Sequence, residues 1–456
     1  MTSGWPYLME LDQEADVRFF GWIMAGYSLG QMISCWLFGW WSQVTASTRY
    51  PAIFGLLLAA GGNVLYGLLP ALPYNRKWYM LVARLFTGWG AVFLREYSTG
   101  TLSLIRSYCA MASLHKDRSR VVAIASACFT IGIAAGPSIQ ALFLPFGKTG
   151  IKLFSIHINM FTAPAFALVI VCVVGMVVLA TCFKEDYVAM VSDEEKKNSF
   201  VIVPKFDRVA AYTCIYMCFI VQTIETALEV LSTPFGVSLY NWTTEQAIFY
   251  YGVVHTCSST IDVINYGILS FTRIRKMDMR RLLLFGISCF TIYELLLLPW
   301  PFYDGPLDYI KLAPNSTVED PSYSGGCFQV YRWCSQTTRV PIYIYLVGSV
   351  IVLGFGFPFH FTPTGVIFSE VLGPRKQGMM QGIFAFFGSS ARCITPLYQT
   401  YLFKHSGYLW PNLICLSLLL IGITLLLSFW SRLIPLRMVP KLGVATRYKG
   451  GVFYHL

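Results

Sequence analysis

Long apolar stretches dominate this chain, and short polar segments separate them. Eleven of the stretches are long enough to cross a bilayer, whose hydrocarbon core requires about 20 mostly apolar residues. They lie approximately at 18–40, 50–72, 78–112, 119–145, 159–183, 207–235, 245–272, 280–300, 341–363, 376–402 and 408–432. The pattern predicts an all-α, polytopic membrane protein with about eleven transmembrane helices.

Composition agrees with this prediction. Hydrophobic residues make up 55% of the chain and charged residues 12%, whereas soluble domains carry about 25% charged residues. We attribute the net charge of +11 to membrane topology and to contact with anionic lipid, so no nucleic-acid partner is needed to explain it. The sequence contains no phosphate-binding loop, zinc-protease motif or nucleophile elbow. We therefore expect a protein that is not an enzyme and that requires neither a cofactor nor a metal.

The distribution of Lys and Arg predicts the orientation of the chain. These residues mark the cytoplasmic side, and they concentrate in the set of connections that contains segment 184–206 and the tail 433–456. We therefore place the C-terminus in the cytoplasm and the N-terminus of this chain in the lumen. Segment 184–206 is expected to be a linker between an N-terminal helical bundle (1–183) and a C-terminal six-helix bundle (207–432).

The opposite side of the membrane carries two further signals. The N-glycosylation acceptors Asn241 and Asn315 both fall there. Cys327 and Cys334 share the long luminal loop 301–340, where an oxidising compartment favours a disulfide. We expect both asparagines to be glycosylation sites and the two cysteines to be bonded.

The cytoplasmic linker contains a candidate sorting signal. The run from Tyr187 to Met190 fits the pattern of a tyrosine, two residues of any kind and a bulky apolar residue. It predicts an adaptor protein as a partner at the linker. Four-residue patterns of this kind also arise by chance, which leaves an ordinary solvated linker as the alternative.

Three short motifs resemble the signature motifs of the major facilitator superfamily, and they stand in the expected order. They are Gly39-x-x-Ser42, Arg84-x-x-x-Gly88-x-Gly90 and Gly132-x-x-x-Gly136-Pro137. Longer segments, such as 21–32, 241–247 and 372–378, resemble a lysosomal branch of this superfamily. The resemblance implies a fold of two helical bundles, secondary transport of a small solute, and a lysosomal or endosomal membrane. For the glycines and Pro137, close packing of helices is the simpler interpretation.

The chain departs from the superfamily pattern in three places. Residues 5–8 resemble the luminal end of the first helix, so eleven helices of twelve are expected here. Residues 42–44 stand where the superfamily usually has an acidic residue followed by a basic one in the first cytoplasmic loop. The resemblance therefore does not predict the usual charge interaction of this loop. Residues 92–99 look like an insert in the fourth helix, where they would place Arg95 and Glu96 at membrane depth.

Ionisable residues at membrane depth are the candidates for a substrate or ion pathway. We single out Arg84, Arg106, Glu225, Glu229, His360 and Arg392, and note the further acids Asp262, Glu294 and Glu370. Arg84 and Arg106 lie close to one face of a single predicted helix. They predict a cationic stripe that favours an anionic substrate, unless each side chain reaches its nearer membrane surface.

Two of these candidates suggest proton coupling. Glu225 and Glu229 are four residues apart and therefore share a helix face. Glu229 is either a proton carrier or a structural partner of Arg392 or Arg84. His360 lies in the stretch 354–363, which its prolines and glycines prevent from being a regular helix throughout. It is either a proton carrier or a hydrogen-bonded structural residue.

The sequence leaves three classes of function open. The first is a secondary transporter of a small solute, anionic or proton-coupled, with the lipid bilayer as its other partner. The second is a passive anion conductance on the same scaffold. The third is a non-transporting relic, which a missing first helix would favour because polar groups of the central cavity would then face lipid.

Overall fold

The computed structural model describes most of the helical part of the chain. The described residues are 7–8, 11–12, 17–45, 47–90, 108, 120–128, 131–132, 143, 146–147, 150–153, 156–185, 205–310, 325–329, 331–373, 377–436, 446–449 and 452–455. Contacts divide the chain into two compact units. The first comprises Met1–Asp207, Ser369–Cys393 and Pro435–Leu456, and the second comprises Arg208–Phe368 and Ile394–Ile434.

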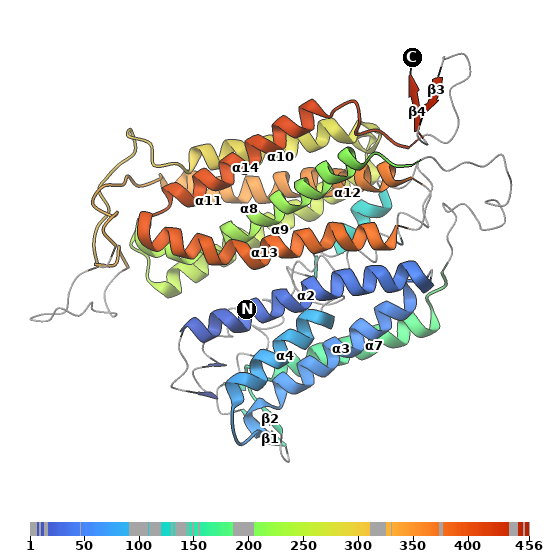
Figure 1. Ribbon diagram of the computed structural model, residues 1–456. Coiled ribbons are helices and arrows are strands. Elements are labelled where there is room, and N and C mark those ends of the chain that lie inside the picture. Colours follow the sequence, from blue (N-terminus) through green and yellow to red (C-terminus); the bar gives the residue numbers. More distant parts are fainter. Residues whose placement is uncertain are drawn as a thin grey trace, which may run out of the picture. The chain divides into compact units, whose positions relative to one another are not determined.

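Four long helices form the described core of the first unit. They are α2 (Val17–Thr45), α3 (Arg49–Gly67), α4 (Arg76–Gly90) and α7 (Ala163–Thr181), with a short 3-10 turn η1 (Leu69–Ala71) after α3. Helix α4 packs against both α2 and α3, and α3 also packs against α7. Figure 1 shows these helices running beside one another in blue and green. The apolar stretches of the sequence thus form helices that pack against one another, although α7 buries only Ala163, Ala165 and Cys172.

The remaining helices follow in chain order from Arg208. They are α8 (Arg208–Tyr240), α9 (Thr244–Phe271), η4 (Arg273–Lys276), α10 (Met279–Leu296), α11 (Ile342–Ile351), η5 (Val352–Gly356), α12 (Phe357–Leu372), α13 (Gly378–Ser406) and α14 (Leu409–Ser428). Local chemistry fixes some of their starts. Thr243 and Gln246 form a capping box at α9, and the carboxylate of Asp278 caps α10.

Five helical segments of the described residues are long and apolar enough to cross a membrane. They are Arg49–Gly67, Ala163–Thr181, Arg208–Ser232, Ile342–Leu372 and Leu409–Ser428. Helices outside this set also bury polar side chains, and α9, for example, buries Ser258, Asp262 and Asn265. Such residues lower the mean hydropathy of a helix without exposing its polar groups to lipid.

Helix geometry changes in the middle of the segment 342–372. Residues Val352–Gly356 form a π-helical turn, η5, between α11 and α12. This agrees with the expectation that the stretch 354–363 is not a regular helix throughout. π-Turns of this kind occur often at functional positions. The helix continues through Pro363.

Two short hairpins interrupt the helical architecture. Strands β1 (Ile151–Leu153) and β2 (Ile156–Ile158) pair antiparallel, as do β3 (Thr446–Lys449) and β4 (Val452–His455). The sequence prediction of a tail at 433–456 contained no strands. Aromatic and β-branched residues, such as Val452 and Phe453, favour extended backbone and explain the second hairpin.

Candidate functional site

Arg84 is a buried cation of the first unit. It lies on α4 with 9% of its surface exposed. Its guanidinium carbon lies 4.8 Å from the centre of the Tyr66 ring on α3, a cation–π contact. Among the described residues, Nε of Arg84 has no hydrogen-bond partner and the side chain makes no ion pair. A buried guanidinium with unused donors is suited to an anionic ligand.

Glycines at the helix crossings of the first unit allow the helices to approach one another closely. A Cβ atom on Gly88 would lie 2.1 Å from the carbonyl oxygen of Tyr27, and one on Gly90 would lie 2.1 Å from the amide nitrogen of Ala59. A Cβ atom on Gly39 of the first motif would lie 2.8 Å from the Cα atom of Gly382. These three glycines therefore allow close packing of helices, as small residues do in membranes.

Glu225 and Glu229 differ in their surroundings, although one helical turn separates them on α8. Glu225 is buried and accepts a hydrogen bond of 3.3 Å from Nε2 of Gln222, whereas Glu229 is exposed. The two carboxyl groups share a helix face, as their spacing predicts, but they are not both buried. Neighbouring helices cover only part of the helix face that carries the two acids.

His360 lies on α12, directly after the π-turn. The side chain is fully buried, and its ring centre lies 6.1 Å from that of Phe290 on α10. Neither ring nitrogen has a hydrogen-bond partner among the residues that the structure describes. The neighbouring ring of Phe290 is apolar. As a proton carrier or as a hydrogen-bonded residue, His360 would therefore need a water or a ligand as its partner.

A side chain from α9 supports the π-turn itself. The amide nitrogen Nδ2 of Asn265 donates a hydrogen bond of 2.7 Å to the carbonyl oxygen of Gly354. Gly354 also approaches Ile261 of α9 closely enough that a Cβ atom would lie 2.7 Å from the Ile261 side chain. Asn265 was not among the sequence candidates, because an isolated asparagine carries no motif.

The other candidates are distributed along the chain. Arg392 is half-buried on α13, within the first unit. A Cβ atom on Gly132 would meet no described atom within 4 Å. Several candidates lie outside the described residues, namely Arg106, Gly136, Pro137, Tyr187, Met190 and Asn315.

The segment between α10 and α11, which the sequence predicts to be luminal, is held by a disulfide and an ion pair. Cys327 and Cys334 are bonded. Asp308 Oδ2 accepts hydrogen bonds from Nη2 of Arg339 at 2.8 Å and from Nδ2 of Asn241 at 2.9 Å. The hydrogen bond from Arg339 is the main cause that lowers the pKa of Asp308 below its ordinary value, and that from Asn241 adds to it.

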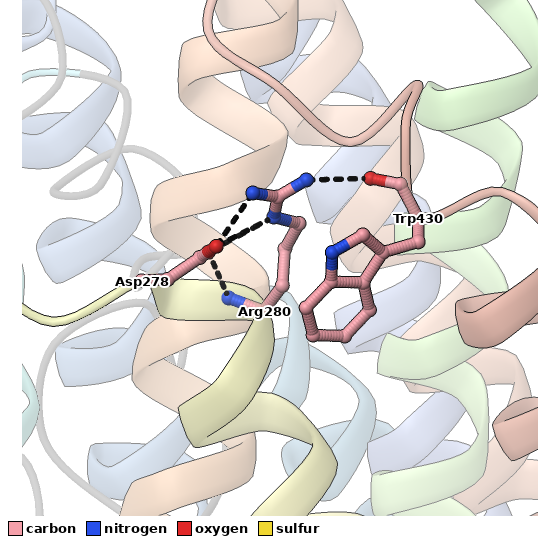
Figure 2. A network of polar contacts seen from close by, with 3 residues as sticks. All are labelled: Asp278, Arg280 and Trp430. Carbon is pink, nitrogen blue, oxygen red and sulfur yellow. Dashed lines mark hydrogen bonds and ion pairs between the residues drawn. The ribbon is translucent and has the colours of Figure 1, made fainter.

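A second charged cluster lies where α10 begins. Arg280 donates hydrogen bonds to both carboxylate oxygens of Asp278 and, through Nη1, to the carbonyl oxygen of Trp430 at 2.7 Å (Figure 2). Its guanidinium carbon also lies 4.9 Å from the centre of the Trp430 ring. The side-chain hydrogen bond from Arg280 lowers the pKa of Asp278. The cluster thus ties the start of α10 to the end of α14.

Glu185, at the beginning of the predicted linker, has a role that the sequence did not reveal. Its Oε1 accepts hydrogen bonds from the backbone nitrogens of Thr48 and Arg49, at 2.6 and 2.5 Å. It therefore supplies the missing acceptor at the start of α3, where Thr48 makes no side-chain cap. An acid far along the chain in sequence thus stabilises the start of α3, directly after the connection from α2.

Comparison with known proteins decides the family. A sequence profile of the Major Facilitator Superfamily matches residues 2–311. The chain belongs to the major facilitator superfamily. It is 30% identical over 464 residues to major facilitator superfamily domain-containing protein 8 of Xenopus laevis, with 95% of this chain and 88% of that relative covered. An SPX domain-containing membrane protein of Arabidopsis thaliana is 28% identical over 181 residues, which cover 39% of this chain and 23% of the plant protein.

Solved structures share the major facilitator fold. The human organic anion transporter MFSD10 matches with a TM-score of 0.62 at 14% identity, covering 92% of this chain and 87% of that one. The Escherichia coli fucose:proton symporter FucP matches with a TM-score of 0.59 at 13% identity, covering 92% and 93%. These likenesses confirm the predicted all-α fold. As a member of the superfamily, the chain is a multi-pass membrane protein of a transporter family whose members act on small solutes or ions.

Proposed function

We propose that the protein is a secondary transporter of a small anionic solute in an endolysosomal membrane, and that protons are its coupling ion. The observation that carries the anionic preference is Arg84, a buried cation with no ion-pair partner among the described residues. A cation held at membrane depth is costly, and a function is the usual reason for keeping it. The resemblance to the lysosomal branch supports the location.

Proton coupling is supported by the acids of the second unit. Glu225 is a buried carboxyl group hydrogen-bonded to an uncharged side chain, and Glu229 is an exposed acid one turn further along α8. Carboxyl groups within membrane-spanning helices are common members of proton relays. Of the two solved structures that share this fold, MFSD10 is an organic anion transporter and FucP is a fucose:proton symporter.

Binding tests the anionic preference before any flux is measured. A ligand that binds only the folded state raises the thermal midpoint, so purified protein is heated with succinate, with chloride and with uncharged or cationic solutes of similar size. We expect anions to raise the midpoint and Arg84→Gln to remove the increase. Arg332→Gln, an exposed arginine of the luminal loop, is the matched control. Equal stabilisation by cations, or an unchanged response in Arg84→Gln, contradicts the proposal.

Passive anion conductance is the second candidate, because Arg84 would favour anions in a pore as well. Flux in proteoliposomes separates the two. A coupled transporter takes up the stabilising anion in a saturable manner, and uptake rises with an imposed proton gradient. A conductance passes chloride current at equal pH on both sides. Uptake that is linear in concentration and insensitive to the proton gradient would favour the conductance.

A further inference from the structure

Glu294 is a buried acid that takes no part in the proposed transport function. It lies in the last turn of α10 with 2% of its surface exposed. Its Oε2 has no hydrogen-bond partner, and no Lys, Arg or His of the described chain makes an ion pair with it. It is therefore a carboxyl group inside the second unit without a compensating positive charge.

The carboxyl group borders a small, partly open cavity between helices. Side chains of α8, α10, α11 and α14 line this cavity, and its polar lining comes from Ser232, Glu294, Tyr345, Asn412 and Cys415. The space open to the centre of a water molecule is about 20 Å³. A single water requires roughly 10–15 Å³ on the same measure, together with polar partners. The cavity therefore has room for one water.

The hydrogen bonds around the cavity leave acceptors unused. Ser232 donates its hydroxyl to the carbonyl oxygen of Glu229 at 2.8 Å, and Nδ2 of Asn412 donates to the carbonyl oxygen of Leu297 at 3.1 Å. The oxygens Oγ of Ser232 and Oδ1 of Asn412 receive no hydrogen bond from a described residue. A water or an acid proton in the cavity would satisfy them.

The titratable groups that face Glu294 are all neutral when protonated. They are Tyr345 of α11, Cys415 of α14, Tyr398 of α13 and Tyr293 of α10 itself. The part of α8 that borders the cavity contributes Ser232, and η5 contains no titratable residue. His360 packs against Phe290, which lies one turn before Glu294 on α10. It forms no ion pair with Glu294.

We propose that Glu294 and this cavity form a proton-binding site, in which the carboxyl group is held as the neutral acid and hydrogen-bonds to one bound water. An ionised carboxylate without a partner costs several kcal/mol in a protein interior, and such a group becomes neutral instead. The few oxygens of the lining would not replace the hydration shell of a metal cation. The site is independent of which solute the protein transports.

Infrared spectroscopy of the purified full chain tests the site without a transported solute. At about pH 7 an ordinary Glu is ionised, so the carbonyl stretching band of a carboxylic acid reports a protected proton. We expect this band in the wild-type protein, and we expect Glu294→Gln to remove a defined component of it. Asp308→Asn, which alters a carboxylate that is ion-paired in the lumen, should leave the band unchanged.

Three outcomes would overturn the proposal. The first is a wild-type spectrum without any acid band, which needs no variant and therefore holds even if Glu294→Gln does not fold. The second is an unchanged band in folded Glu294→Gln, which would assign the proton elsewhere, for instance to Glu225. The third is a thermal midpoint that rises when sodium replaces choline in wild type but not in Glu294→Gln, which would make the occupant a cation.

Discussion

The side-chain amide of Asn241 donates a hydrogen bond of 2.9 Å to Asp308, although 67 residues separate the two in the chain. Asn241 directly follows α8, and its φ of 55° places it in the left-handed region that asparagine tolerates. Thr243 of the same acceptor motif is occupied in the capping box of α9. This acceptor motif therefore connects the α8–α9 turn to the segment between α10 and α11.

This engagement of Asn241 changes the expectation that both asparagines carry a glycan, and we now predict a glycan on Asn315 alone. We predict that Asn315→Gln removes the glycosidase-sensitive shift in gel mobility, because the amide nitrogen of Asn241 is engaged by Asp308 and Asn315 stands in the long luminal loop. Asn241→Gln should leave the shift in place. A shift that persists in Asn315→Gln and disappears in Asn241→Gln would contradict this assignment, and the absence of any glycan on the loop would contradict the predicted topology.

The Asp308 ion pair should survive an acidic lumen. Its folded-state pKa is lowered, chiefly by Arg339, so its stabilisation is complete above the unfolded value of about 3.9 and is lost only as pH falls through the folded value. We expect Asp308→Asn to lower the thermal midpoint equally at about pH 7 and pH 5, by the equivalent of about 0.2–1 kcal/mol for an exposed pair. A difference that vanishes already at pH 5 would argue against the pair.

The Asp278–Arg280 cluster should matter more than its exposed neighbour. Asp278→Ala removes the cap of α10 and the partner of Arg280, so we expect a loss of about 1–2 kcal/mol in stability. Asp278→Asn keeps a capping oxygen and should lose less. Arg281→Lys is the control, since Arg281 is adjacent but exposed. Thermal unfolding of the three variants measures the order, and equal midpoints for Asp278→Ala and Arg281→Lys would refute it.

Gly88, in the second motif, and Gly61 differ in the space available for an added methyl group. Gly88→Ala places a methyl group 2.1 Å from the Tyr27 carbonyl oxygen, and overpacking of this kind costs about 1–3 kcal/mol or more. Gly61→Ala on α3 meets nothing within 4 Å and removes an unfavourable helical glycine. We expect the folded yield, measured by size-exclusion chromatography in detergent, to fall for Gly88→Ala and to hold for Gly61→Ala. Equal yields would mean that the crossing is not tight.

The π-turn should depend on Asn265. Asn265→Leu keeps the side-chain size but removes the donor to the Gly354 carbonyl oxygen, and leaving such a buried group unpaired costs about 1–3 kcal/mol. We expect a lower thermal midpoint and altered uptake kinetics. Ser258→Ala, on the same helix and hydrogen-bonded only within it, is the control. Unchanged stability in Asn265→Leu would show that the turn does not need this support.

The sequence determined where the helices run and to which family the chain belongs. Apolar stretches of about 20 residues can satisfy their backbone polar groups in lipid only as helices, so α3, α7, α8 and α14 follow from hydropathy alone. The prolines and glycines of the stretch 354–363 also predicted an irregular helix, because these residues act on the backbone hydrogen bonds of their own segment.

Only the tertiary structure decided which polar groups have partners. Glu225 and Glu229 share a helical periodicity, yet one is buried and the other exposed, because burial depends on helices that lie far away in the chain. For the same reason the roles of Glu185 and Asn265 could not be predicted, since each serves a backbone group of another element. The position of Glu294, away from every described cation, also emerged only in the folded chain, where side chains of α8, α10, α11 and α14 surround the cavity beside it.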